Sequence, residues 1–299
     1  MHPSLLPEYV LILLNVFWFL ELVLAFAYQF IVSSLRGPAP LHHTLLAERT
    51  RTGVTLQTLH NKHFDHGTIL KQTPMPGFEI PNPHSCTVPE LLDLVSVKGA
   101  QILIDGIRSG SFVPPVEPAI CYPAGGQDGT AHLIHAGKIK TEDRHIDWKT
   151  WSWVEISKRM RVLGPLWSKA TVADPKVHDL RQERRVIFTS MEKVELPLND
   201  HFSYDPSWFP PGQPFVEGSH PFLEQRHQQQ AGGNDNGGSR RKLYVFSQDG
   251  SLIRIHQMKV EGERIADGFS AALKARMVGN QTCRWGASNI CTLFYERLA

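Results

Sequence analysis

The sequence lacks the cysteine patterns of disulfide-bonded, zinc-binding or thiol-redox proteins. Its 299 residues include only four cysteines, and no two of them form a C-x-x-C pair. We therefore expect free thiols in a reducing compartment and no metal site. His60, His63, Asp65 and His66 lie close together in the chain, but no metal-ligand spacing repeats elsewhere, which favours a solvated turn over a metal cluster.

Lys and Arg are absent from the first 35 residues, which contain one long apolar run. Val10–Val32 has only Asn15, Glu21 and Gln29 as strongly polar residues. Its length would reach across a bilayer, for which about 20 apolar residues suffice. However, a charged residue near the centre of a span costs roughly 2.5–3.5 kcal/mol, and Glu21 lies there. The run also lacks the basic start and the small-residue cleavage site of a signal peptide.

The boundaries of the run allow another interpretation. Glu8-Tyr9-Val10 can be encoded by bases that include GTAYGT, which resembles the 5′ end of an intron, and Ser34 can supply a terminal AG. Excision from the third base of codon 8 through the second base of codon 34 removes 78 bases and keeps the reading frame. We therefore interpret residues 9–34 as an apolar insertion translated from a retained intron, in preference to a membrane span.

The rest of the chain has the composition of a globular protein with one large or two modest domains. Hydrophobic residues make up 41% of the sequence and charged residues 20%. All 31 Lys and Arg residues follow Leu35, so this part is mildly basic. Such a balance is compatible with a nucleic-acid partner and does not by itself demonstrate one.

Local patterns in the first part of the chain predict pieces of an α/β domain. Residues 40–48 are expected to form a helix, and residues 53–59 and 69–72 are expected to form strands. Thr87-Val-Pro-Glu90 is a capping box that opens a second helix, with apolar residues near helical spacing as far as Gly110. These strands are too few for a complete domain.

A change of composition separates the second part. Residues 111–135 contain several prolines and glycines and are predicted to be a linker. From residue 136 onward, short β-like stretches occur at 186–188, 243–246 and 252–256, and Asp249-Gly250 is a strong hairpin signal. Residues 203–240, rich in Gln, Asn and Gly, are predicted to be a disordered loop. The pattern suits a small β-barrel of oligonucleotide-binding (OB) type.

Motifs in the first part resemble the folate-dependent formyltransferases. His2-Pro-Ser-Leu-Leu-Pro7, continued by Leu35-Arg-Gly-Pro-Ala-Pro40, is similar to the family's catalytic loop. Thr52-Gly-Val-Thr55 and Phe64-Asp-His-Gly67 resemble two further blocks of the family. Removal of codons 9–33 brings His2 and Asp65 from 63 to 38 positions apart, close to the family spacing, which supports the intron interpretation.

Motifs in the second part narrow the resemblance to methionyl-tRNA formyltransferase, of the fungal mitochondrial type. His135-Ala-Gly-Lys-Ile139 and Arg161-Val-Leu-Gly-Pro-Leu-Trp167 resemble the start of its C-terminal domain. The resemblance implies an α/β + β fold. Residues 1–110 would be the C-terminal part of a Rossmann-like formyltransferase domain, and residues 136–299 a small OB-like, tRNA-binding β-barrel.

The resemblance also implies a role for each matched residue. His2 is the proton-transfer residue and Asp65 its carboxylate partner, a pairing suited to general acid–base catalysis. The cosubstrate 10-formyltetrahydrofolate is expected to contact the loop that holds Ser4, Leu5, Leu6 and Pro7. The acceptor is initiator methionyl-tRNA, with candidate contacts at Arg36, Lys138, Lys140, Arg159 and Arg161. The family implies a monomer in the mitochondrial matrix.

The chain departs from the family pattern at its start. The family has an asparagine two residues before His2, preceded by the strands and glycine loop of the nucleotide-fold half. We expect that the gene model begins at an internal Met and that this chain, as it stands, is inactive. Two alternatives stay open: a related formyltransferase acting on a sugar or nucleotide, and a membrane-anchored, non-catalytic remnant if residues 10–32 are a genuine span.

The intron interpretation predicts the structure of the mature transcript. We expect reads across codons 8 to 34 to lack the 78 bases and to encode Pro-Asp-Leu-Arg at the junction. Long-read sequencing of complementary DNA is the measurement. Retention of the 78 bases in every read would refute the interpretation.

Overall fold

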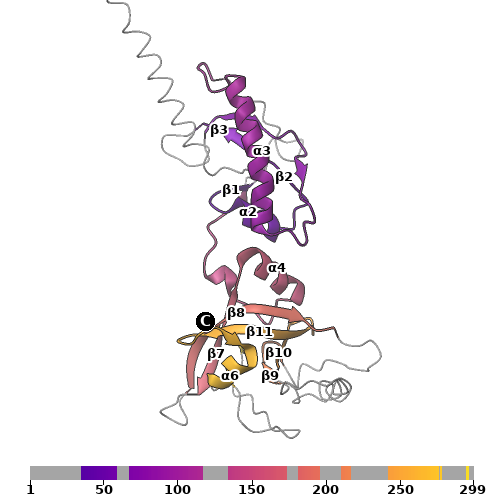
Figure 1. Ribbon diagram of the computed structural model, residues 1–299, viewed down its shortest axis with the longest axis vertical. Helices are drawn as coiled ribbons and strands as arrows, with labels where there is room; N and C mark the ends of the chain where they lie inside the picture. Colours follow the sequence, from indigo (N-terminus) through magenta and orange to yellow (C-terminus); the bar gives the residue numbers. More distant parts are fainter. Residues whose placement is uncertain are drawn as a thin grey trace, which may run out of the picture. The chain divides into compact units, whose positions relative to one another are not determined.

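The computed structural model describes residues 35–58, 67–116, 134–173, 181–195, 210–216, 242–275, 277 and 294–295. The chain forms two compact units, unit 1 (residues 1–139) and unit 2 (residues 140–299), each with its own helices and strands (Figure 1). Within the described ranges, no helix has both the length and the apolar character needed to cross a bilayer. The apolar run at 10–32 lies outside these ranges.

Unit 1 is built from short elements. They are β1 (Leu35–Arg36), α2 (Pro40–Leu46), β2 (Arg51–Thr52), β3 (Thr55–Gln57), β4 (Ile69–Gln72), β5 (Phe78–Glu79), α3 (Val88–Arg108) and β6 (Ile134–His135). The strands form three two-stranded sheets, of which β1–β6 is parallel and the other two, β2–β5 and β3–β4, are antiparallel. A parallel pair is typical of α/β folds, and the Rossmann-like assignment stays a prediction.

Helix α3 begins as the sequence predicts. The Thr87 hydroxyl accepts a hydrogen bond from the Glu90 N–H, and the Glu90 carboxylate accepts one from the Thr87 N–H at 2.7 Å. Both halves of the capping box are therefore present, and the prediction is confirmed. Near its other end α3 lies against β3 at a glycine: a Cβ at Gly106 would be 2.6 Å from the Leu56 side chain.

Unit 2 is dominated by one antiparallel sheet. Its elements are the 3-10 helix η1 (Glu142–Arg144), α4 (Trp153–Leu163), β7 (Leu166–Ala173), β8 (Arg181–Lys193), β9 (Phe215–Val216), β10 (Leu243–Phe246), β11 (Leu252–Val260), β12 (Ala266–Asp267), α6 (Gly268–Lys274) and β13 (Phe294–Tyr295). The strand order is β13-β7-β8-β11-β10-β9, with β12 paired to β11. The predicted strands at 186–188, 243–246 and 252–256 are confirmed within β8, β10 and β11.

The core of unit 2 lies on one face of this sheet. Phe188 of β8 is fully buried and pairs in register with Leu166 of β7 and Met258 of β11. A bulge in β11 between Ile255 and Met258 keeps both of these side chains in the core. Burial of a side chain the size of phenylalanine contributes roughly 1.5–3 kcal/mol. This shared face therefore fixes the register of the three central strands.

Two helices pack on this core. Ile156 of α4 and Ala271 and Ala272 of α6 are buried members of the same cluster as the sheet residues. Helix α6 begins directly against β11, because a Cβ at Gly268 would be 2.3 Å from the Ile255 carbonyl oxygen. Glycine is the residue that allows so close an approach of two backbones.

The described strands do not form a closed barrel. In the described part of the chain, β13 and β9 are the two ends of the strand path and do not pair with each other. The OB-like assignment therefore stays a prediction. The predicted hairpin at Asp249-Gly250 is confirmed: β10 and β11 pair antiparallel, and Gly250 has a φ of 75°, which favours glycine.

The capping box leads to a stability prediction. Thr87→Ala removes the hydroxyl that accepts from the N–H of Glu90, and we expect the free energy of unfolding of unit 1 to fall by about 1 kcal/mol. Thr87→Ser keeps the acceptor and serves as the matched control. Urea unfolding followed by far-UV circular dichroism measures both variants. An unfolding midpoint for Thr87→Ala equal to that of the native chain would contradict the assignment.

The Asp249 turn leads to a pH prediction. Partial burial raises the pKa of Asp249, but hydrogen bonds from Ser247, Ser251 and the Trp153 backbone outweigh it, so the pKa lies below its ordinary value of 3.8. A depressed folded-state pKa adds stability above the unfolded value, and this stability is lost as pH falls through the folded value. Asp249→Asn should therefore be less stable than the native chain at pH 7, with the gap closing below pH 3.8.

Thermal unfolding at pH 7, 5 and 3 measures this gap. Asp93→Asn, which removes an exposed carboxylate from α3, is the control and should show no such convergence. A gap for Asp249→Asn that is the same at all three pH values would count against the turn as its origin.

Candidate functional site

The catalytic and folate-binding residues predicted from the motifs lie outside the described part of the chain. These residues are His2, Asp65, Ser4, Leu5, Leu6 and Pro7. Their roles stay predictions. What the structure does describe is the frame to which the two motif segments are attached.

The first part of this frame holds the residues that follow the catalytic-loop motif. Leu35 is buried, and β1 pairs in parallel with β6. Gly37 has a φ of 129°, and a Cβ there would be 2.4 Å from the Ala136 carbonyl oxygen, so only glycine fits. The Ala39 N–H donates to the same carbonyl at 3.3 Å. The Arg-Gly-Pro-Ala block is thus attached to residues 134–136, about 100 positions later in the chain.

Helix α2 strengthens this attachment. It starts at Pro40, a residue whose fixed φ suits the first turn of a helix. His43 Nε2 lies 3.0 Å from the Gly137 carbonyl oxygen. The chain leaving unit 1 is therefore held by both the strand and the helix that follow the predicted catalytic loop.

The second part of the frame holds the two ends of the segment that contains Asp65. The Thr58 N–H donates to the Thr68 carbonyl, and the Thr68 N–H donates to the Thr58 hydroxyl, both at 2.9 Å. Gly67 is required here, since a Cβ would be 1.5 Å from the Thr58 carbonyl oxygen. The residues on either side of segment 59–66, which includes Asp65, are therefore joined by hydrogen bonds.

The Thr-Gly-Val-Thr motif supports this pair of strands. The Val54 N–H donates to the Thr73 hydroxyl at 2.9 Å, and that hydroxyl donates to the Val54 carbonyl at 3.2 Å. Thr55 then pairs with Gln72 in the β3–β4 sheet. In the described structure, this motif therefore fixes the start of β3 to the end of β4.

The described residues offer no evident metal site. Nowhere in the described ranges do three His, Cys, Asp or Glu side chains gather as metal ligands would. His60, His63, Asp65 and His66 are outside these ranges, so the expectation of no metal stays a prediction.

The candidate tRNA contacts differ in their surroundings. Lys138 and Lys140 are exposed, whereas Arg159 and Arg161 on α4 are half-buried. Arg36 lies in β1, and its side chain is outside the described part. No acidic side chain of the described residues forms an ion pair with either lysine. The structure leaves the assignment of all five residues a prediction.

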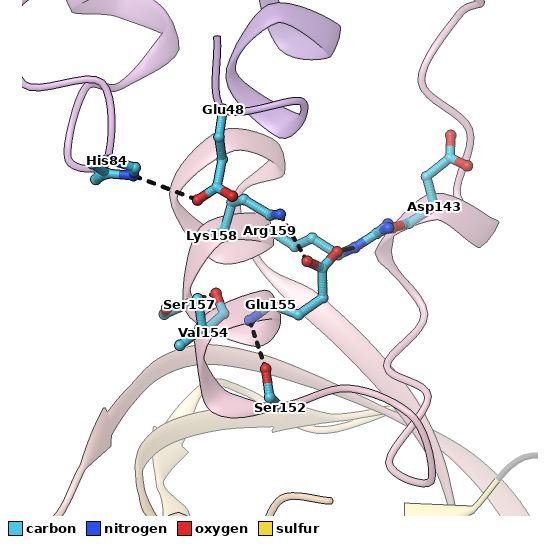
Figure 2. Close-up of polar contacts among 9 residues, drawn as sticks. All are labelled: Glu48, His84, Asp143, Ser152, Val154, Glu155, Ser157, Lys158 and Arg159. Atoms are coloured by element: carbon cyan, nitrogen blue, oxygen red, sulfur yellow. Dashed lines mark hydrogen bonds and ion pairs between the residues drawn. The ribbon is translucent and has the colours of Figure 1, made fainter. Parts of the chain in front are cut away.

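Arg159 is held inside unit 2 (Figure 2). Its Nε donates to Glu155 at 2.5 Å, and its Nη1 donates to the Asp143 carbonyl at 3.1 Å. The guanidinium lies 4.3 Å from the centre of the Trp151 ring, a cation–π contact. Figure 2 also shows, within unit 1, a surface pair between His84 and Glu48 at 3.6 Å.

Glu155 is the centre of the charged group on α4. Partial burial raises its pKa, but hydrogen bonds and charge from Lys158 and Arg159 outweigh burial, and the pKa of Glu155 lies below its usual value. Its N–H donates to the hydroxyl of Ser152, the N-cap of α4. The carboxylate stays ionised at neutral pH and neutralises part of the positive charge around it.

A second aromatic and basic group lies on the opposite face of the sheet from the core. The Arg185 guanidinium is 4.2 Å from the centre of the Trp167 ring, and the His145 ring is also 4.2 Å from it. The Trp167 indole donates to the Thr141 carbonyl at 2.8 Å. Arg185 and His145 were not predicted from the sequence, because their contacts with Trp167 form only when residues that are distant in the chain come together.

Comparison with known proteins finds relatives of similar sequence. No family model matches the chain. The mitochondrial methionyl-tRNA formyltransferase of Saccharomyces cerevisiae is 32% identical over 189 residues, which cover 58% of this chain and 39% of the relative. The human mitochondrial protein of the same name is 32% identical over 143 residues, covering 46% and 33%. That of a Geobacillus species is 33% identical over 135 residues, covering 45% and 38%.

Solved structures give looser likenesses. HypX from Aquifex aeolicus in complex with tetrahydrofolic acid is 12% identical with a TM-score of 0.42, covering 81% of this chain and 33% of that chain. An N-formyltransferase from Helicobacter canadensis is 12% identical with a TM-score of 0.37, covering 75% and 62%. TM-scores below 0.5 do not show that this chain shares the fold or the substrate of these proteins.

The sequence relatives cover about half of this chain. The chain spans about two-fifths or less of the length of these curated relatives. The resemblance inferred from the motifs is confirmed: over roughly half of its length, this chain is similar to the methionyl-tRNA formyltransferases of mitochondria and bacteria.

Proposed function

We propose that this chain is part of an enzyme that transfers a formyl group from 10-formyltetrahydrofolate to the amino group of initiator methionyl-tRNA. The observation that supports this most is the alignment with the yeast mitochondrial relative, at 32% identity over 189 residues. The product, formylmethionyl-tRNA, starts translation. Because the yeast and human relatives are mitochondrial, we place the proposed reaction in the mitochondrial matrix, carried out by a monomer.

Each predicted site residue has a role in the proposed reaction. The methionyl amine attacks the formyl carbon, and His2 takes up the proton that the amine loses. The bond from the formyl carbon to N10 of the folate then breaks, and tetrahydrofolate leaves with a proton on N10. Asp65 fixes the tautomer of His2 and orients it toward the amine. Ser4, Leu5, Leu6 and Pro7 contact the folate. A developing oxyanion needs donors, and the family asparagine that would supply one precedes the motif at His2.

The frame described above is consistent with this proposal. The parallel β1–β6 pair anchors the segment after the His2 motif, and the β3–β4 pair anchors both ends of the segment with Asp65. Unit 1 would then be the second half of a Rossmann-like domain. Unit 2 would be an OB-like domain that contacts tRNA through Lys140 and Arg161. Lys138, at the end of unit 1, would be a further contact, and Arg36 would lie closer to the chemistry.

A formylation assay tests the proposal. The protein to assay is a version extended upstream to include the family asparagine and lacking residues 9–33. We expect it to formylate methionyl-tRNA, and we expect His2→Ala to lower kcat/KM by about 10²–10⁴-fold, the usual contribution of general acid–base catalysis. The unextended chain should be inactive. The readout is formylmethionyl-tRNA separated from methionyl-tRNA on acid gels.

Two further arms make the assay decisive. His84→Ala, at an exposed histidine outside the motifs, is the matched control and should keep full activity. An amino-sugar nucleotide offered as acceptor tests the alternative formyltransferase reading. Equal activity of the His2→Ala and parent proteins would overturn the role of His2, and formylation of the sugar without formylation of tRNA would replace the proposed acceptor.

A further inference from the structure

Arg159 joins three segments of unit 2. Its guanidinium donates to the backbone of η1 at Asp143, donates to Glu155 of α4 and lies over the ring of Trp151. Trp151 is itself fixed, since its N–H donates to the Asp147 carbonyl at 2.9 Å and its carbonyl accepts from the Gln248 N–H at 3.3 Å. Residues 143–151 are thereby attached to α4 through one side chain.

This arrangement leaves Arg159 poorly placed to bind a phosphate. Its side chain is 26% exposed, and the planar fork that Arg would present to an anion is already used at Nε and Nη1. The Glu155 carboxylate beside it offsets its charge. Arg159 also lies on the side of α4 that bears buried Ile156 and Leu163, by helical spacing, while Val154 on the opposite side is 63% exposed.

Lys140 has the opposite character. It is exposed, and in the described part of the chain no carboxylate forms an ion pair with it. Its backbone, however, is firmly held: the Lys140 N–H donates to the Asp143 carboxylate at 2.7 Å. The next carbonyl, that of Thr141, accepts from the Trp167 indole at 2.8 Å. Asp143 therefore links Lys140 to Arg159, because Arg159 holds the Asp143 carbonyl.

We propose that Arg159 is a positioning residue for tRNA binding: it holds Asp143, and Asp143 in turn fixes Lys140, which meets the phosphate backbone. This inference rests on the proposed function, because it takes tRNA as the ligand. It revises the role of Arg159 from a direct contact to one exerted through Lys140.

Arg159→Lys is the informative variant because it keeps the charge and removes the fork and the planar stack. We call the contacts of Arg159 with Glu155, the Asp143 carbonyl and Trp151 the Arg159 clamp. We expect amide hydrogen exchange at Lys140, Arg144 and His145 to become about tenfold faster or more, since the free energy of the lost contacts corresponds to about this factor. We expect the affinity for initiator methionyl-tRNA to fall about tenfold for the same reason. Arg264→Lys makes the same change at an exposed arginine of unit 2 and should alter neither quantity.

A double-mutant cycle with Lys140→Ala shows whether Arg159 acts through Lys140. Lys140→Ala should weaken tRNA binding and reduce the slope of log affinity against log salt by about 1, as expected for one phosphate contact. Added to Lys140→Ala, the Arg159→Lys change should cost little further affinity, because the two residues act in series.

Each other outcome overturns the proposal in a distinct way. Additive losses, or lost affinity with unchanged exchange, would mean that Arg159 contacts tRNA directly. If Arg159→Lys changes neither the hydrogen exchange nor the tRNA affinity, Arg159 does not hold residues 140–145. If it speeds hydrogen exchange but leaves the tRNA affinity unchanged, Arg159 holds these residues but does not serve tRNA binding. If the native chain fails to bind tRNA, the proposed function fails, while the exchange measurement still decides whether Arg159 fixes residues 140–145.

Discussion

The antiparallel pairing of β8 with β11 is the interaction on which unit 2 depends. It sets Phe188 beside Met258 in the core, and the bulge in β11 bends that strand so that Ile255 also stays buried. Strand β7 then adds to the other side of β8 in unbroken register. The Ile146 N–H donates to the Trp167 carbonyl on β7, so the segment that follows Lys140 is fixed to the sheet.

The sequence predicted those elements whose cause is local. The capping box at Thr87 and the Asp249-Gly250 hairpin were both recognisable because a few adjacent residues satisfy the backbone by themselves. Helix α4 and strand β7 were not predicted. Helix α4 has a local signal, the N-cap Ser152 that accepts from the N–H of Glu155, and the distant Asp249 carboxylate also accepts from the N–H of Trp153 at its start. Strand β7 depends on its pairing with β8.

The candidate site was predictable from the sequence to a similar extent. Motif spacing predicted His2 and Asp65, and this stays a prediction. The structure describes how residues near these motifs are held by distant segments. Composition identified Arg159 as a cation, but the direction of a side chain depends on what packs around it. The stack on Trp151 and the bond to the Asp143 carbonyl form only in the folded unit. Residue type alone therefore could not separate Arg159 from Lys140.

The described frame also bears on the apolar insertion. Leu35, Gly37 and Ala39 are held by contacts with residues 134–136. The proposed excision of 78 bases would join Pro7 through one acidic residue to this segment. In the proposed enzyme such an anchor close to His2 would matter, since small misplacements of reacting groups cost large factors in rate.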